Sequence, residues 1–216
     1  MINRDAAHRG LYVHIPFCLK KCHYCDFVIT TGNDHRPFLN SLKNEIAHYA
    51  PRFQKTVFET LYLGGGTPSV LTGGELKEIF GWLRGSFNFK KNAEITVETN
   101  PGDVASGKAE AYLKLGVNRI SLGAQSFNDR TLKAVNRTHQ AADTGASFKI
   151  LCRAGFSNIN ADLILSLPGE GFRELESSLS RAVKLGPTHV SLYELTIEEK
   201  NRVRDRIQER CVETSR

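Results

Sequence analysis

Three cysteines near the start of the chain form the pattern with the clearest chemical meaning. Cys18, Cys22 and Cys25 have the spacing CxxxCxxC. Four thiolates normally hold a cubane iron–sulfur cluster, so three cysteines leave one iron atom open to a small molecule. Lys20 and Lys21 lie within the same loop and would lower the pKa of the thiols. The triplet therefore predicts a [4Fe–4S] cluster with one exchangeable position.

Other interpretations of these cysteines stay open at this point. Cys22 and Cys25 could form a redox-active CxxC pair, and the triplet could bind structural zinc together with His14 or His23. Zinc sites usually combine two CxxC units, and this sequence has one. A disulfide framework fits poorly, because five cysteines in 216 residues are neither dense nor even in number.

Composition and charge narrow the class of protein. With 216 residues, 40% of them hydrophobic, the chain can bury the core of one domain. The net charge of +6 does not indicate nucleic-acid binding, because six Lys or Arg against three Asp or Glu in residues 200–216 contribute half of it. The start of the chain lacks the pattern of a signal peptide, and no apolar run reaches membrane-spanning length. We expect a cytoplasmic protein, with Cys152 packed in its core and Cys211 exposed.

The elements that must position these residues alternate along the chain. Six apolar or β-branched runs are typical of strands: 11–15, 56–63, 94–98, 119–122, 159–165 and 190–195. Six helical patterns follow them: 38–49, 74–83, 104–115, 128–135, 143–154 and 170–185. This alternation predicts an α/β fold with a parallel sheet, and six units fit a partial (β/α)₆ TIM-like barrel better than a closed barrel of eight. An open doubly wound sheet is the alternative.

Residues that could bind a ligand fall at the ends of these strands. Gly64–Pro68 follows the second strand, where glycines let backbone groups approach a ligand, although a tight turn explains the stretch equally well. Glu98 ends the third strand, Gln125 follows the fourth and Asp162 lies within the fifth, and a polar group at or inside the barrel needs a ligand or a core hydrogen bond. Arg137 could bind a carboxylate or be a solvated surface charge. Beside a cluster loop, this set favours a small zwitterionic ligand.

Seven separated motifs, in matching order, resemble proteins of the radical SAM superfamily. They are Tyr12–Cys18, the cysteine triplet, Gly64–Pro68, Glu98–Pro101, Ser121–Asn128, Asn136–Arg137 and Asp162–Gly169. The resemblance extends from Leu11 to about Glu198 and points to the coproporphyrinogen-oxidase-like branch. It implies a radical SAM core over residues 1–198 and a charged tail over residues 199–216 with no counterpart in the family.

The resemblance also implies cofactors and the residues that bind them. In such proteins the cysteine triplet holds the [4Fe–4S] cluster, and the open iron binds the amino and carboxylate groups of S-adenosylmethionine. An electron from the cluster then cleaves the sulfonium C–S bond, which gives methionine and a 5′-deoxyadenosyl radical. The residues that match the family's contacts to S-adenosylmethionine are Tyr12, Tyr24, Gly65, Gly66, Thr67, Glu98, Gln125, Arg137, Asp162 and Thr196.

Two branches of the family differ in function. Asp26-Phe27 after the triplet and the stretch Leu195–Glu199 resemble the HemW-type heme chaperones, which bind heme and pass it to acceptor proteins. Oxygen-independent coproporphyrinogen III dehydrogenases of porphyrin biosynthesis, which carry a further cysteine beyond the triplet, are the alternative. The resemblance implies heme or porphyrin, a heme acceptor and an electron donor as partners, and leaves open whether the chain is an enzyme. A truncated, non-functional fragment is a third expectation, because the family's C-terminal domain is absent from the sequence.

Overall fold

The computed structural model describes residues 8–197, so the charged tail and Cys211 lie outside the described residues. Its centre is one sheet of six strands that follow the order of the sequence. Neighbouring strands all pair in parallel. The strands are β1 (Gly10–Ile15), β2 (Val57–Gly65), β3 (Asn88–Thr99), β4 (Arg119–Gln125), β5 (Ile159–Leu165) and β6 (His189–Glu194).

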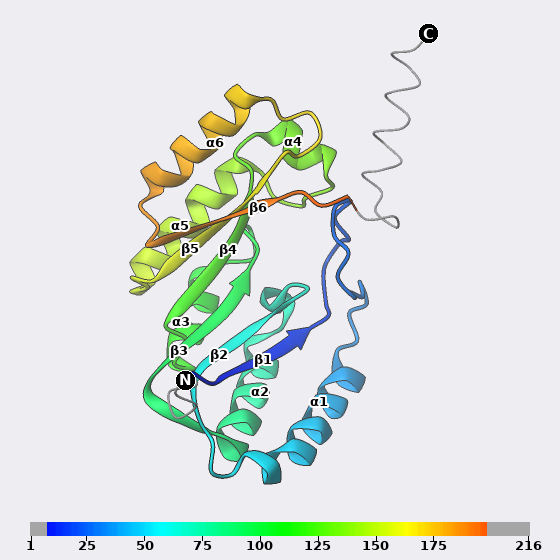
Figure 1. Ribbon diagram of the computed structural model, residues 1–216, viewed down its shortest axis with the longest axis vertical. Helices are drawn as coiled ribbons and strands as arrows, with labels where there is room; N and C mark the ends of the chain where they lie inside the picture. The colour runs from blue at the N-terminus through cyan, green and yellow to red at the C-terminus, as the bar shows by residue number, and fades with distance from the viewer. Residues whose placement is uncertain (1–7, 198–216) are drawn as a thin grey trace, which may run out of the picture.

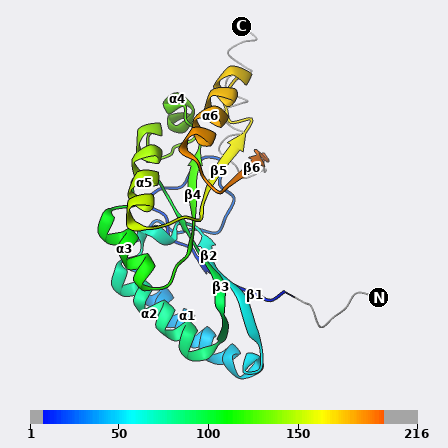
Figure 2. The ribbon, with the colours of Figure 1, turned by 90° about the vertical axis from the view of Figure 1, so that its left-hand side faces the viewer.

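Every connection between strands contains a helix. The helices are α1 (Arg36–Tyr49), α2 (Gly73–Ser86), α3 (Ser106–Lys114), α4 (Asp129–Ala134), α5 (Ala141–Ala154) and α6 (Phe172–Leu185), with short 3₁₀ helices η2 (Ala50–Phe53) and η3 (Pro68–Val70). Figure 1 shows the helices around the sheet, and Figure 2 shows α2, α3 and α5 together on one side of it. None of the helices in the described part of the chain is long and apolar enough to cross a membrane.

The strand order decides between the two predicted architectures. A doubly wound sheet reverses its strand order at a switch point, whereas the order here runs from β1 to β6 without reversal. Within residues 8–197, β1 pairs only with β2 and β6 only with β5, so the sheet is open at both edges. The prediction of a partial (β/α)₆ barrel is confirmed, and the doubly wound alternative is wrong.

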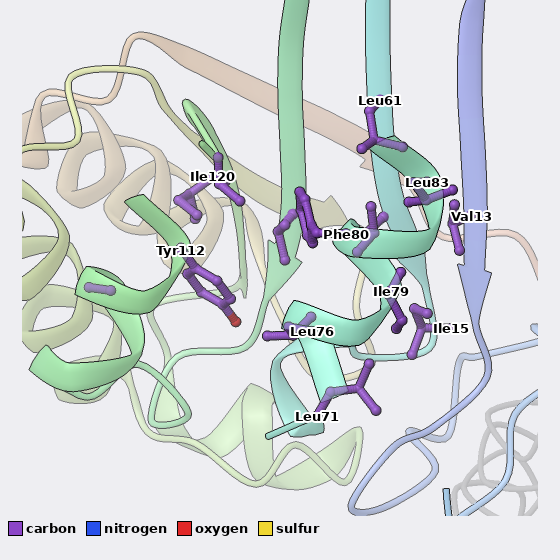
Figure 3. Close-up of a cluster of buried hydrophobic side chains, with 14 of the residues drawn as sticks. Val13, Ile15, Leu61, Leu71, Leu76, Ile79, Phe80, Leu83, Tyr112 and Ile120 are labelled. Carbon is purple, nitrogen blue, oxygen red and sulfur yellow. The ribbon is translucent and has the colours of Figure 1, made fainter. Parts of the chain in front are cut away.

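Alternation along the strands separates the core from the interior of the barrel. Val13 and Ile15 of β1 belong to one buried cluster with Ile79 of α2 (Figure 3). Successive side chains of a strand point to opposite faces of the sheet. Tyr12 and His14 therefore point away from the helices, into the barrel. The same alternation in the other strands directs polar side chains toward the inside.

Two local expectations differ from the structure. The third strand was expected over residues 94–98 but begins at Asn88. Its first residues are too polar to give a strand pattern, and they are held by pairing with β2, where the rings of Phe58 and Phe89 lie 5.9 Å apart. Cys152 is exposed rather than packed in the core, because α5 turns a different face toward the sheet.

Candidate functional site

A cavity of about 510 Å³ opens at the C-terminal ends of the strands. Parallel α/β folds place their ligand sites at this edge of the sheet, and small-molecule sites measure roughly 300–1,000 Å³. Every predicted site residue except Tyr12 lines it: Cys18, Cys22, Tyr24, Cys25, Gly65, Gly66, Thr67, Glu98, Gln125, Arg137, Asp162 and Thr196. The fold thus brings together residues that are far apart in the sequence.

The cysteine loop leaves the end of β1 and is fastened to the segment after α4. The His23 N–H donates to the Val135 carbonyl at 3.0 Å. The Asn136 amide donates to the Lys21 carbonyl at 2.7 Å. Asn136 has a φ of 66°, a left-handed conformation that Asn adopts more readily than most residues. These contacts fix the middle of the loop over the cavity.

Two of the three thiols have polar neighbours inside the cavity. Cys18 Sγ lies 3.3 Å from Thr67 Oγ1. Cys22 Sγ lies 3.7 Å from Arg137 Nη1. A hydroxyl and a guanidinium can both donate hydrogen bonds to sulfur, so each of these two cysteines has a donor beside it.

Burial affects the thiols more strongly than the nearby lysines do. It raises the pKa of the Cys18 and Cys25 thiols, and the charge of Lys21 lowers that of Cys25 by less. Lys21 therefore lowers the pKa of Cys25 as expected, but burial outweighs it and the net pKa of both thiols is raised. A redox-active CxxC pair relies on a lowered thiol pKa, so this environment does not favour that alternative.

The geometry also does not favour a structural zinc site. Among residues 8–197, no three His, Cys, Asp or Glu side chains are arranged around a single metal ion. The His14 Nε2 lies 3.2 Å from the Val28 carbonyl, and the His23 Nδ1 lies 3.1 Å from the Ala134 carbonyl. A cubane binds its thiolates at separate iron atoms, so its ligands need not converge on one point. Three free thiols at the rim of one cavity fit such a cluster.

The glycine stretch closes the end of β2 against the end of β1. Gly65 has a φ of 107°, and a Cβ there would collide with the His14 ring. A Cβ on Gly66 would lie 2.8 Å from the Ile15 carbonyl oxygen and 2.7 Å from that of Phe17. The Gly66 N–H donates to the Ile15 carbonyl at 2.8 Å. The left-handed backbone at Gly65 and the close backbone packing at Gly66 thus require glycine at both positions, and the same turn exposes their backbone to the cavity.

Two of the carboxylates that line the cavity, Glu98 and Asp162, are predicted site residues, and both have protein partners. Glu98 accepts hydrogen bonds from the Tyr62 hydroxyl at 2.8 Å and from the Gly65 N–H at 3.1 Å. Burial raises the pKa of Glu98, although these two hydrogen bonds oppose the shift. Asp162 accepts from the Ser121 hydroxyl at 2.8 Å. Both carboxylates are therefore held in place before any ligand arrives.

Arg137 is held by partners from several elements and is not a solvated surface charge. Its Nη2 donates to Asn100 Oδ1 and to the Gly123 carbonyl, each at 2.7 Å. Its Nη1 lies 3.3 Å from the Tyr24 hydroxyl, and its Nε lies 3.4 Å from His139 Nδ1. The guanidinium is thus fixed beside the cysteine loop.

Two of the residues that hold Arg137 are not predicted from the sequence. Asn100 belongs to the motif Glu98–Pro101 and to the turn after a strand, but the patterns give neither Asn100 nor His139 a role. His139 is 4% exposed, and its Nε2 lies 3.1 Å from the Ala124 carbonyl. Burial and the charge of Arg137 lower the pKa of His139 to about 4. The ring is therefore neutral at pH 7, and its Nδ1 can accept from Arg137.

Tyr12 lies beside the cavity rather than in its lining. Its side chain is 55% exposed at the open edge of β1, and its hydroxyl lies 3.1 Å from His14 Nδ1. Its ring lies 6.0 Å from the ring of Tyr62. The alternation of β1 directs Tyr12 inward, but its place early in the strand keeps it below the cavity.

Fold and site together define a class: a parallel partial barrel whose cavity is bordered by a three-cysteine loop. The family model described as the radical SAM superfamily matches residues 12–182. The chain belongs to the radical SAM superfamily, because this match covers most of its length. Membership carries the superfamily's two cofactors, a [4Fe–4S] cluster and S-adenosylmethionine.

Curated relatives include several heme chaperones. The chain is 38% identical to the heme chaperone HemW of Escherichia coli (strain K12) over 196 residues, which is 88% of this chain and 51% of that protein. It is 34% identical to the heme chaperone HemW of Bacillus subtilis (strain 168) over 195 residues, 89% of this chain and 52% of that protein. The chain thus spans about half the length of the curated relatives it matches.

Solved structures support the same assignment. Coproporphyrinogen III oxidase (HemN) from Escherichia coli, described as a radical SAM enzyme, superimposes with a TM-score of 0.82 at 28% identity, over 96% of this chain and 52% of that chain. The radical S-adenosylmethionine methyltransferase TsrM from Kitasatospora setae gives a TM-score of 0.68 at 13% identity, over 94% of this chain and 40% of that chain. The second likeness shows the fold alone. The predicted family is confirmed.

Proposed function

We propose that this chain is a heme-chaperone-like radical SAM protein that takes part in binding heme and transferring it to acceptor proteins. The observation that carries the proposal is the group of three free thiols at one cavity with the residues that match the family's contacts. Similarity to heme chaperones supports the heme part, although those proteins are about twice as long. A cytoplasmic location, a heme acceptor and an electron donor belong to the same proposal.

In this proposal, Cys18, Cys22 and Cys25 bind three of the four irons. When bound, the cluster supplies the electron that cleaves the sulfonium bond of S-adenosylmethionine. Three thiolates add negative charge to a partly enclosed site, and Arg137 offsets part of that charge because Nη1 lies 3.7 Å from Cys22 Sγ. The protein's part is to bind the cofactors, orient them and limit water.

The remaining lining residues suit the zwitterionic part of S-adenosylmethionine. Gly65 and Gly66 present backbone without side chains, Glu98 and Asp162 offer carboxylate acceptors, and Arg137 offers a donor for a carboxylate. Further contacts proposed from the family motifs are Tyr12, Tyr24, Thr67, Gln125 and Thr196. Of these five, Tyr12 lies outside the lining and has the weakest support.

A porphyrin-oxidising enzyme of the coproporphyrinogen III dehydrogenase type is the second candidate. The TM-score of 0.82 to HemN favours it. We favour the chaperone, because the curated relatives described above are heme chaperones that are 34% and 38% identical to this chain. Asp26 and Phe27, directly after the triplet, also match the chaperone branch.

The first experiment tests the cofactors. The protein is reconstituted anaerobically with iron and sulfide and reduced, and its EPR spectrum is recorded with and without S-adenosylmethionine. We expect a cluster signal that changes when S-adenosylmethionine is added. Cys22→Ala should lose the visible absorbance of the cluster, whereas Cys152→Ala, at an exposed thiol of α5, should keep it. A spectrum that S-adenosylmethionine does not change would contradict the open iron.

The second experiment separates the two candidate functions. The reconstituted protein is offered heme together with an apo heme protein, and separately coproporphyrinogen III with reductant and S-adenosylmethionine. A chaperone should bind heme and transfer it, and should leave coproporphyrinogen unchanged. Turnover of coproporphyrinogen would establish the enzyme instead. If a protein that carries its cluster fails in both assays, cofactor binding is the only activity that can be assigned to this chain.

A further inference from the structure

One amide side chain connects two of the three cysteines. Asn100 Nδ2 donates to Thr67 Oγ1 at 3.2 Å, and Thr67 Oγ1 lies 3.3 Å from Cys18 Sγ. On its other side, Asn100 Oδ1 accepts from Arg137 Nη2 at 2.7 Å, and Arg137 Nη1 lies 3.7 Å from Cys22 Sγ. A continuous chain of side-chain contacts therefore runs from one sulfur to the other through Asn100.

The direction of these hydrogen bonds favours donation to sulfur. Because Asn100 Nδ2 donates to Thr67 Oγ1, the Thr67 hydroxyl hydrogen is free to point at Cys18 Sγ. Arg137 can act only as a donor, so its contact with Cys22 has the same direction. Asn100 uses its acceptor for one of these side chains and its donor for the other.

The backbone around Asn100 fixes the orientation of its amide. Asn100 is the first residue after β3, and its N–H donates to Ser69 Oγ at 3.2 Å. Ser69 Oγ in turn donates to Asp103 Oδ2 at 2.8 Å, and the Asp103 N–H donates to the Asn100 carbonyl at 3.2 Å. This closed turn holds the residue from both sides, so its side chain is presented to Thr67 and Arg137 in one arrangement.

We propose that Asn100 is a positioning residue that raises the reduction potential of the cluster by holding Thr67 and Arg137 against Cys18 and Cys22. The reduced cluster carries one more negative charge than the oxidised cluster. Hydrogen bonds to its sulfur ligands therefore stabilise the reduced form more and raise the potential. The inference rests on the proposed cluster and extends it to a residue that does not touch iron.

The test is the midpoint potential of the reconstituted cluster, measured by EPR-monitored redox titration without S-adenosylmethionine. Asn100→Ala removes both contacts and should lower the midpoint potential by about 59 mV. This shift corresponds to an equilibrium constant for one-electron reduction that is about tenfold smaller. Asn92→Ala, at an exposed position of β3, the strand that Asn100 follows, is the matched control and should match the wild type. Iron content and visible absorbance establish that each variant carries its cluster.

A second variant covers the case in which Asn100→Ala fails to fold or to retain its cluster. Thr67→Val is nearly isosteric and removes only the hydroxyl at Cys18, so it should lower the potential as well. In the double variant, the shift should be smaller than the sum of the single shifts, because Asn100 acts partly through Thr67. Potentials equal to the wild type in cluster-bearing variants would overturn the inference. A wild type that binds no cluster would instead overturn the proposed function and this inference with it.

Discussion

Replacing Gly66 by Ala should destabilise the protein, because the added methyl group has no space. A Cβ at Gly66 would lie 2.7 Å from the Phe17 carbonyl oxygen and 2.8 Å from that of Ile15. Both oxygens belong to backbone and cannot rotate away. The Gly66 N–H bonds to Ile15 at 2.8 Å and the Thr67 N–H bonds to Phe17 at 2.7 Å, so relief of the collision strains the two contacts that join β1 to the turn.

Overpacking of this kind lowers the free energy of unfolding by about 1–3 kcal/mol, and each kcal/mol lowers the Tm of a domain of this size by about 2–4 °C. Gly81→Ala is the control, because beyond its chain neighbours and the backbone of its own helix no described atom lies within 4 Å of a Cβ there, and the position is inside α2. An Ala inside a helix should raise stability by about 0.5–1 kcal/mol. Urea unfolding of the two variants, followed by circular dichroism, should therefore move the midpoint in opposite directions. An unchanged midpoint for Gly66→Ala would refute the packing argument.

Two further predictions concern the charged and titratable groups of the site. The pKa of His139 is lowered to about 4 in the folded protein, whereas a histidine in the unfolded chain has its usual pKa of about 6.5. As the pH falls from 7.5 to 5, the unfolded state takes up a proton that the folded state does not, and roughly 2 kcal/mol of stability should be lost. His139→Gln should reduce this pH dependence in urea titrations, and an equal dependence in both proteins would contradict the neutral, buried ring. Glu98→Gln replaces a carboxylate that we propose as an acceptor for S-adenosylmethionine by an amide, and loss of one hydrogen bond to the ligand, about 1.4 kcal/mol, should weaken its binding to the reconstituted protein about tenfold by calorimetry. Glu94→Gln, exposed on the same strand, should bind normally, and normal binding by both variants would remove Glu98 from the site.

The elements could be predicted from the sequence because parallel strands are buried on both faces and appear as apolar runs. All six predicted strands and six helices are present in the predicted order. Pairing over residues 88–93 was missed, since the segment owes its strand conformation to β2 and not to its own pattern. A sheet order without reversal is a property of the whole chain, and local patterns do not contain it.

The residues of the site also fall into two groups, those that could be predicted from the sequence and those that could not. The cysteine loop could be predicted because metal ligands follow a short, fixed spacing. The role of Asn100 could not, because its partners Thr67 and Arg137 lie 33 and 37 positions away, and the sequence motifs relate those two residues to S-adenosylmethionine and not to Asn100. His139 gives no signal although it lies two positions from Arg137, because only the fold buries its ring and brings Nδ1 to 3.4 Å from Arg137 Nε. The role of a positioning residue can be recognised only in the structure, because the structure shows which side chains it contacts.

The proposed cofactor contacts are unevenly distributed over the strands and loops of the fold. The cysteine loop, the glycine turn and the side chains that hold Arg137 all come from β1 to β5 and the loops that follow them. Beyond β6, Thr196 is the one proposed contact, and it is exposed. The cofactor contacts that we propose therefore lie mainly in a part of the fold that residues 8–197 provide. The relatives named heme chaperones are about twice as long as this chain, so the two parts of the proposal, cofactor binding and heme handling, need separate tests.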